Sequence, residues 1–166
     1  FSEDVKKKID NDSVLRKDYG FNHIDMSEIQ FSFDNDKVNQ LINEIESKRV
    51  YFELGKVNLN QSEEIKLRAL AEKIDNLYST AKKSGIKMNI KVLGYADSSG
   101  SSELINERIS RLRAEQVYNY LVEKSMDSEK ISFKGMGKYK DATVQSADQS
   151  EQRVVMIKIE KQQNHD

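Results

Sequence analysis

From about residue 48 onward, the apolar residues of this chain switch between two spacings, and this switching restricts the fold more than any other feature. They recur at every second position in residues 50–54 and 88–93, which predicts strands. They recur at helical spacing in two longer segments, which predicts amphipathic helices. The first helical stripe comprises Leu67, Leu70, Ile74, Leu77, Tyr78 and Ala81. The second comprises Ile105, Ile109, Leu112, Val117 and Leu121. Two further apolar runs, 131–133 and 154–159, predict a third and a fourth strand.

The predicted order of elements is therefore strand, helix, strand, helix, strand, strand. A helix between two strands makes a crossover connection, which implies that some strands pair in parallel. We predict an α/β fold, a two-layer α+β sandwich of order βαβαββ, with two helices on one face of a four-stranded mixed sheet. Asn60 and Ser62 are expected to cap the first helix, and Gly85 is expected to end it.

The first 47 residues differ from the rest in being more charged and less regular. They contain a predicted strand at 29–33 and then a predicted helix. The apolar positions of that helix are Val38, Leu41, Ile42 and Ile45. We interpret 1–47 as an N-terminal extension or the end of an upstream module, 48–160 as the main domain and 161–166 as a polar tail. Because the first residue is Phe, we expect a processed or truncated piece, with any signal peptide or anchor upstream.

Composition argues against several classes of function. The 27 basic and 28 acidic side chains give a net charge of −1, so we expect no nucleic-acid partner and no binding to anionic membranes through bulk charge. No apolar run approaches the roughly 18 residues of a membrane span. Cysteine is absent, and His23 and His165 have no patterned partner for a triad or a zinc site. We therefore expect neither an enzyme nor a bound cofactor or metal.

A polar loop between the second predicted strand and the second predicted helix is the candidate functional segment. Asp97 directly follows the strand, Ser98 and Ser99 offer hydroxyl groups, and Gly100 allows the backbone to turn closely. The start of the following helix adds unpaired N–H groups and a partial positive charge, which suit a carboxylate.

Farther along that helix, Asn106 and Arg113 share one face, two turns apart. A carboxylate at Asp97 and a guanidinium at Arg113 would suit a zwitterion, whose ammonium binds the former and whose carboxylate binds the latter. The same spacing also fits an ordinary capped helix, in which Asp97 and Arg113 pair with each other or lie in solvent.

As a motif, this segment is Gly-x-x-Asp-x-x-Gly followed by Asn-x-x-Ile-Ser-x-x-Arg-Ala-x-x-Val. It resembles the peptidoglycan-associating motif of the OmpA-like family. Residues 135–137 (Gly-Met-Gly) and 153–154 (Arg-Val) resemble further segments of that family, so the resemblance extends over about residues 48–160. The motif positions in this chain are Gly94, Asp97, Gly100, Asn106, Ile109, Ser110, Arg113, Ala114 and Val117.

The resemblance implies a non-catalytic, periplasmic module that anchors an envelope protein to the cell wall by gripping the diaminopimelate of the peptidoglycan stem peptide. It implies that Asp97 and Arg113 grip this ligand and that Asn106 shapes the loop and the helix start. Backbone around Ser98, Ser99 and Gly100 is expected to add hydrogen bonds. Tethering to the outer membrane is expected to use a segment that is not in this chain.

The chain departs from the family pattern at several positions. Residues 95–96 are Tyr-Ala where the family usually has His-Thr, and the stretch from Gly100 to Asn106 is one residue longer than the common form. Gln152 stands where the family usually has an arginine. These departures leave an alternative open: a cell-envelope protein-interaction scaffold that keeps the fold without binding peptidoglycan.

Overall fold

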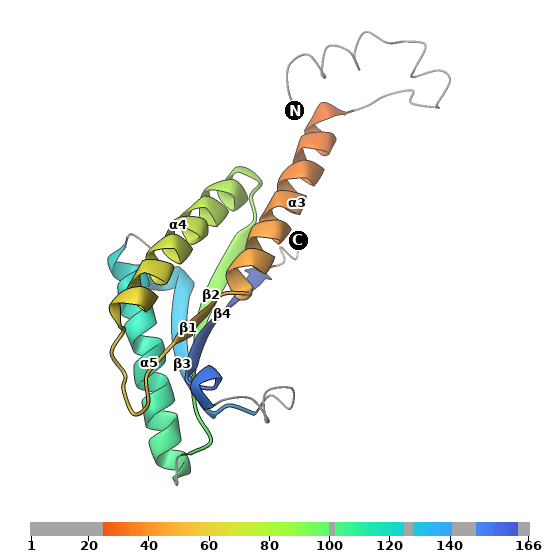
Figure 1. The fold of residues 1–166 in the computed structure, drawn as a ribbon. Helices are drawn as coiled ribbons and strands as arrows, with labels where there is room; N and C mark the ends of the chain where they lie inside the picture. The colour runs from red at the N-terminus through yellow and green to blue at the C-terminus, as the bar shows by residue number, and fades with distance from the viewer. Residues whose placement is uncertain (1–24, 100–101, 125–127, 141–148, 163–166) are drawn as a thin grey trace.

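The computed structural model describes residues 25–99, 102–124, 128–140 and 149–162, which form three long helices and a four-stranded sheet (Figure 1). The predicted α/β class with a mixed four-stranded sheet is confirmed. In chain order the elements are α3 (Met26–Glu46), β1 (Arg49–Tyr51), α4 (Gln61–Lys83), β2 (Lys87–Ala96), α5 (Glu103–Glu123), the 3-10 turn η1 (Ser128–Lys130), β3 (Ile131–Lys138), the 3-10 turn η2 (Gln149–Glu151) and β4 (Val154–Gln162).

The strands lie in the order β1-β4-β2-β3, so the long strands β2 and β4 form the middle of the sheet. β2 pairs in parallel with β3, which follows it through the crossover helix α5, and antiparallel with β4. In the middle of β2, Val92 lies opposite Phe133 on one side and Ile157 on the other. Because the side chains of a strand alternate between its two faces, Ile90 and Val92 both enter the core, and both are fully buried.

Helix α4 begins and ends where its sequence predicts. The side chain of Asn60 accepts a hydrogen bond from the backbone N–H of Glu63 at 2.9 Å, which caps the helix. The hydroxyl of Ser62 donates to the same Asn60 oxygen instead of capping the helix itself. Gly85 follows the last turn with φ of 68°, a conformation that favours glycine. The predicted apolar stripe of α4 lies in the core, with Tyr78 partly buried at its edge.

Helix α3 is a third helix beyond the two predicted for the main domain. It packs against α4 and β4, and its predicted apolar positions all join the same core. The backbone N–H of Ile159 on β4 donates to Glu46 at the end of α3 at 3.0 Å, which ties the helix to the sheet. The first turns of α3 extend past the sheet (Figure 1).

The strand predicted at 29–33 is wrong, because these residues are the first turns of α3. The side chain of Asp25 accepts from the backbone N–H of Ser27 at 2.9 Å and caps the helix. Gln30 then bonds to Asp34 one turn later, at 3.2 Å. A local cap and the helical stripe downstream therefore outweigh a five-residue alternation that has no neighbouring strand to pair with.

Strand β1 is shorter than the predicted 50–54. Phe52 lies beyond its end yet remains buried, and its backbone N–H donates to the carbonyl of Arg153 at 2.9 Å. Leu54, expected on the same face as Val50 and Phe52, is 67% exposed. The chain leaves the sheet at this point and forms the connection to α4. No helix in the described part of the chain is both long and apolar enough to cross a membrane.

Candidate functional site

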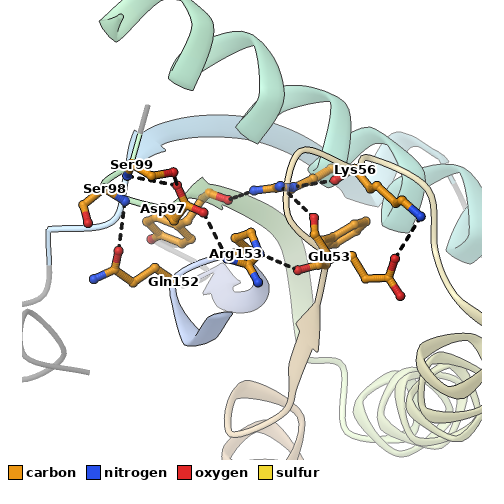
Figure 2. A network of polar contacts seen from close by, with 10 residues as sticks. Glu53, Lys56, Asp97, Ser98, Ser99, Gln152 and Arg153 are labelled. Carbon is orange, nitrogen blue, oxygen red and sulfur yellow. Dashed lines mark hydrogen bonds and ion pairs between the residues drawn. The ribbon is translucent and has the colours of Figure 1, made fainter. Parts of the chain in front are cut away.

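Asp97 lies just beyond the end of β2 and is only 7% exposed. One carboxylate oxygen accepts hydrogen bonds from the backbone N–H of Ser99 at 3.1 Å and from the Ser99 hydroxyl. The other oxygen forms an ion pair with Nη1 of Arg153 at 3.1 Å (Figure 2). Burial alone would raise the pKa of Asp97, but the hydrogen bonds from Ser99 and Arg153 outweigh it and lower the pKa below its usual value. Asp97 is therefore a carboxylate at neutral pH.

The two residues directly before β4 hold this loop in place. The side-chain oxygen of Gln152 accepts from the backbone N–H of Ser98 at 3.0 Å, and Gln152 is 3% exposed. Arg153 donates through Nε to the carbonyl of Phe52 at 2.9 Å while its Nη1 contacts Asp97. Figure 2 shows Arg153 lying between Asp97 and Glu53. Since β4 runs antiparallel to β2, its start and the end of β2 lie at the same end of the sheet.

Arg113 of α5 is a buried guanidinium, 2% exposed, bound to backbone carbonyls. Its Nε donates to the carbonyl of Lys56 at 3.0 Å, and its Nη1 donates to that of Tyr95 at 3.2 Å. Its Nη2 donates over a longer distance, 3.5 Å, to the carbonyl of Glu53. The guanidinium also lies over the ring of Phe52, 5.6 Å from its centre. Arg113 thus ties α5 to the connection between β1 and α4 and to the end of β2.

The charge of Arg113 is influenced by both other ionised groups of this network. Burial, with a smaller contribution from the guanidinium of Arg153, lowers the pKa of Arg113 to about 10, although the carboxylate of Asp97 opposes this change. Arg113 therefore remains charged at neutral pH. These three groups together hold two positive charges and one negative charge, which is an arrangement suited to an additional carboxylate.

The structure brings four of the predicted site residues into one network. Asp97 accepts from Ser99 and pairs with Arg153, and Ser98 is bound to Gln152, the residue before Arg153. Arg113 reaches the same end of β2 through the carbonyl of Tyr95. The remaining two predicted residues are Asn106 and Gly100. Asn106 lines a separate groove beside β3, and Gly100 lies outside the described residues.

The capped-helix interpretation allowed Asp97 and Arg113 either to pair with each other or to lie in solvent. Neither arrangement is found in the described part of the chain. Asp97 pairs with Arg153 rather than with Arg113, and both Asp97 and Arg113 are buried. Sequence reasoning gave Arg153 no role at the site. The available signal was its position, because a polar Gln-Arg pair directly precedes an apolar strand.

The predicted inner face of α5 is partly wrong. Ile105 is 51% exposed and two other predicted positions are only partly buried. The face that meets the sheet instead comprises Asn106, Ser110, Arg113, Ala114, Val117 and Leu121. The helix lies so close to β2 that a Cβ on Gly94 would come within 2.0 Å of the Ser110 carbonyl oxygen. This close approach leaves no room for a side chain at Gly94 and places the small residues Ser110 and Ala114 against the strand.

Among the residues that the structure describes, no group of three His, Cys, Asp or Glu side chains could hold a metal ion.

The polar network at the end of a mixed sheet, with its helices on one face, agrees with a known class of domain. The model of the OmpA family matches residues 51–154 of this chain. The chain belongs to the OmpA family.

Curated relatives and solved structures agree with this membership. Outer membrane protein A of Escherichia fergusonii is 33% identical over 108 residues, which is 65% of this chain and 42% of that protein. Outer membrane protein A of Escherichia coli O157:H7 is 33% identical over the same length, 29% of that protein. The chain thus spans well under half the length of these curated relatives.

Two solved structures share the fold. The peptidoglycan-associated lipoprotein from Burkholderia pseudomallei superposes with a TM-score of 0.55 at 17% identity, covering 69% of this chain and 91% of that one. The OmpA-like domain of FopA1 from Francisella tularensis superposes with a TM-score of 0.51 at 24% identity, covering 69% and 74%.

Proposed function

We propose that this domain is a non-catalytic, peptidoglycan-binding module that anchors an envelope protein to the cell wall by gripping the diaminopimelate of the stem peptide. Membership of the OmpA family supports this, and so does the similarity in fold to a peptidoglycan-associated lipoprotein. The observation that most supports the ligand is the joint position of an ionised Asp97 and a charged Arg113 at one end of β2. A periplasmic location, with a tether to the outer membrane from outside this chain, is part of the same proposal.

The end of diaminopimelate is an amino acid, so it presents an ammonium and a carboxylate together. Arg113 has five N–H groups, and its three bonds to carbonyls use one on Nε and one on each Nη. One N–H on each Nη remains, and a guanidinium grips a carboxylate through two N–H groups. Asp97 would accept from the ammonium, in competition with Arg153 for one of its oxygens.

The test is co-sedimentation of the purified chain with insoluble sacculi of the diaminopimelate type. Asp97→Asn removes the negative charge and keeps the side-chain size, and Asp75→Asn is the matched control because Asp75 is exposed on α4. Loss of one charged contact costs about 1.5–3 kcal/mol, so we expect affinity to fall roughly 10-fold to 150-fold for Asp97→Asn alone. Free diaminopimelate should release the parent, whereas lysine, which lacks the second carboxylate, should do so weakly. Sedimentation of Asp97→Asn equal to that of the parent would show that the assigned residues do not bind the wall.

One observation favours a second candidate, an envelope scaffold that binds protein partners and not the wall. Asp97 and Arg113 already have partners within the chain, Arg153 for the first and three carbonyls for the second. These bonds alone give both residues a structural role. Failure of the parent to sediment with any wall preparation, together with a stable protein partner in crosslinking of whole cells, would favour the scaffold.

A further inference from the structure

A groove of about 180 Å³ lies between α4 and β1, which is an edge strand of the sheet. Its lining includes the apolar residues Val50 of β1 and Leu70 of α4, each only 3% exposed, and these form an apolar floor. Small-molecule sites in proteins usually have a volume of about 300–1,000 Å³. A groove of this smaller size suits one or two side chains of a bound segment better than a whole small molecule.

Cations surround this apolar floor. The groove is lined by Lys48 and Arg49 at the start of β1 and by Lys66 and Lys73 of α4, and none of its lining residues is acidic. Lys66 and Lys73 each pair with one carboxylate nearby, at 2.9 and 3.8 Å. Within the described chain, Lys48 and Arg49 form no ion pair. The groove therefore has a surplus of positive charge, which attracts a negatively charged partner.

The edge of β1 also offers backbone groups to a partner. In an antiparallel pair, alternate residues bond to the neighbouring strand, and the residues between them point their N–H and C=O groups outward. The N–H of Phe52 donates to the carbonyl of Arg153, the residue directly before β4, at 2.9 Å. By alternation Val50 bonds toward β4, whereas the N–H and C=O of Arg49 point to the outer edge. A segment that lies along β1 can bond to both groups of Arg49, as in the binding of peptides by strand addition.

One carboxylate of the chain itself already binds this edge. The backbone N–H of Tyr51, which points outward like that of Arg49, donates to a carboxylate oxygen of Glu63 at 3.0 Å. The same oxygen pairs with Lys66 at 2.9 Å. The N–H of Arg49 is the next outward donor, about 7 Å along the strand, and further cations line the same groove. An acidic residue of a partner would meet the same combination of edge N–H and cation that Glu63 meets.

We propose that the groove beside β1 is a docking site for an acidic, extended segment of a protein partner, which adds to β1 as a strand. An apolar side chain of this segment packs on the floor of the groove, and its carboxylates pair with Lys48, Arg49 and Lys73. None of the residues that line the groove belongs to the Asp97 network. The site therefore goes beyond the proposed function and does not depend on it.

The test uses the ¹⁵N-labelled chain at low ionic strength and two peptides. The acidic peptide is acetyl-Glu-Glu-Val-Glu-Glu-amide, whose valine suits the apolar floor, and the neutral peptide has glutamine in place of each glutamate. The double variant Lys48→Gln with Lys73→Gln removes two cations of the groove. Its control is Lys82→Gln with Lys87→Gln, which also takes one lysine from α4 and one from the start of a strand. Both variants change the net charge from −1 to −3, since two positive charges are lost.

We expect the acidic peptide to shift the amide signals of residues 48–50 and to slow hydrogen exchange at the amide of Arg49, which gains a partner. Exchange at the amide of Tyr51 should change less, because Glu63 already binds it. Two exposed ion pairs correspond to a roughly 2-fold to 30-fold change in affinity, so the Lys48/Lys73 variant should bind the acidic peptide more weakly by such a factor. The Lys82/Lys87 variant should bind it like the parent, and the neutral peptide should bind the parent more weakly than the acidic one.

Each of four results would contradict the proposal. Equal affinity for the acidic and neutral peptides would show that charge does not select the partner. Equal weakening in both double variants would show attraction to surface lysines in general. Unchanged exchange at Arg49 in the bound state would show that no strand is added to β1. If vesicles of phosphatidylglycerol bind the parent and neither peptide does, the cations of the groove contact a lipid surface instead of a peptide.

Discussion

Replacing Arg113 by lysine should destabilise the fold more than replacing it by methionine, although lysine keeps the charge. Arg113 holds two separate backbone segments, the β1–α4 connection and the end of β2, through three carbonyls that bond to its three different nitrogens. A lysine ammonium is a compact charge at the end of a flexible stem, and it cannot reach these carbonyls together. Methionine reaches none of them, but it also carries no charge into the interior.

The structure gives the approximate size of each effect. The bonds to the carbonyls of Lys56 and Tyr95 have ordinary lengths, 3.0 and 3.2 Å, whereas the 3.5 Å contact with the carbonyl of Glu53 contributes little. Leaving a buried carbonyl unpaired costs about 1–3 kcal/mol. Burial lowers the pKa of Arg113 to about 10, which shows that holding the charge inside is itself unfavourable. Methionine removes that cost, and lysine retains it.

We therefore expect the free energy of unfolding at pH 7 to fall by about 1–3 kcal/mol for Arg113→Met and by about 2–4 kcal/mol for Arg113→Lys. Urea denaturation followed by circular dichroism measures both. Arg108→Lys is the control, because Arg108 is exposed on the same helix, and it should stay within about 0.5 kcal/mol of the parent. If Arg113→Lys is as stable as the parent, the three carbonyl bonds are not what holds these segments together.

Two further predictions concern neighbouring positions. Because the pKa of Asp97 lies below its ordinary value of 3.8, its carboxylate contributes stability that is fully present above that pH and is lost as the pH falls through the lowered pKa. Urea titrations should thus find Asp97→Asn less stable than the parent by about 1–3 kcal/mol at pH 7. This difference in stability should shrink below about pH 4. A difference that stays constant with pH would show that the ionised carboxylate is not the cause of the stability. Gly94→Ala should cost about 3 kcal/mol or more, since its Cβ would lie 2.0 Å from the Ser110 carbonyl oxygen. A Cβ at Gly85 would meet no atom within 4 Å, so Gly85→Ala has only the strain of its positive φ and should cost about 1 kcal/mol. Thermal melts in which Gly85→Ala is less stable than Gly94→Ala would contradict the close packing of α5 against β2.

The sequence predicted those elements whose signals are local and repeated. Helix α4 has a cap at Asn60, a stripe of six apolar positions and a glycine after its last turn, and all of these features agree. The strand predicted at 29–33 had only a five-residue alternation, and alternation this short does not distinguish a strand from the start of a helix. The cap at Asp25, which lies outside the apolar pattern, begins a helix at this point instead of a strand.

The residues around the candidate site were only partly predictable, because some of them meet through strand order. Asp97 and Ser99 are two residues apart, so their bond follows from a local turn. Arg153 lies 56 residues from Asp97 and reaches it only because β4 pairs antiparallel with β2. Hydrophobic periodicity indicates that β4 exists, but it does not indicate which strand lies beside it. The partners of Arg113 are carbonyls, which no side-chain pattern can reveal.

Helix α5 shows why the apolar pattern failed near the site and succeeded away from it. Its C-terminal half buries Val117 and Leu121, as periodicity predicts. Its N-terminal half buries polar groups and leaves Leu104 and Ile105 exposed, which reverses the usual amphipathic arrangement. The reversal occurs where glycines on β2 and β3 admit the helix backbone, and where the Ser110 hydroxyl accepts from the backbone N–H of Gly137 at 2.9 Å. The polar groups of this inner face bond to the strands, Ser110 to Gly137 and Arg113 to the carbonyl of Tyr95. Hydrogen bonds therefore hold the N-terminal half of α5 to the sheet, whereas apolar packing holds its C-terminal half.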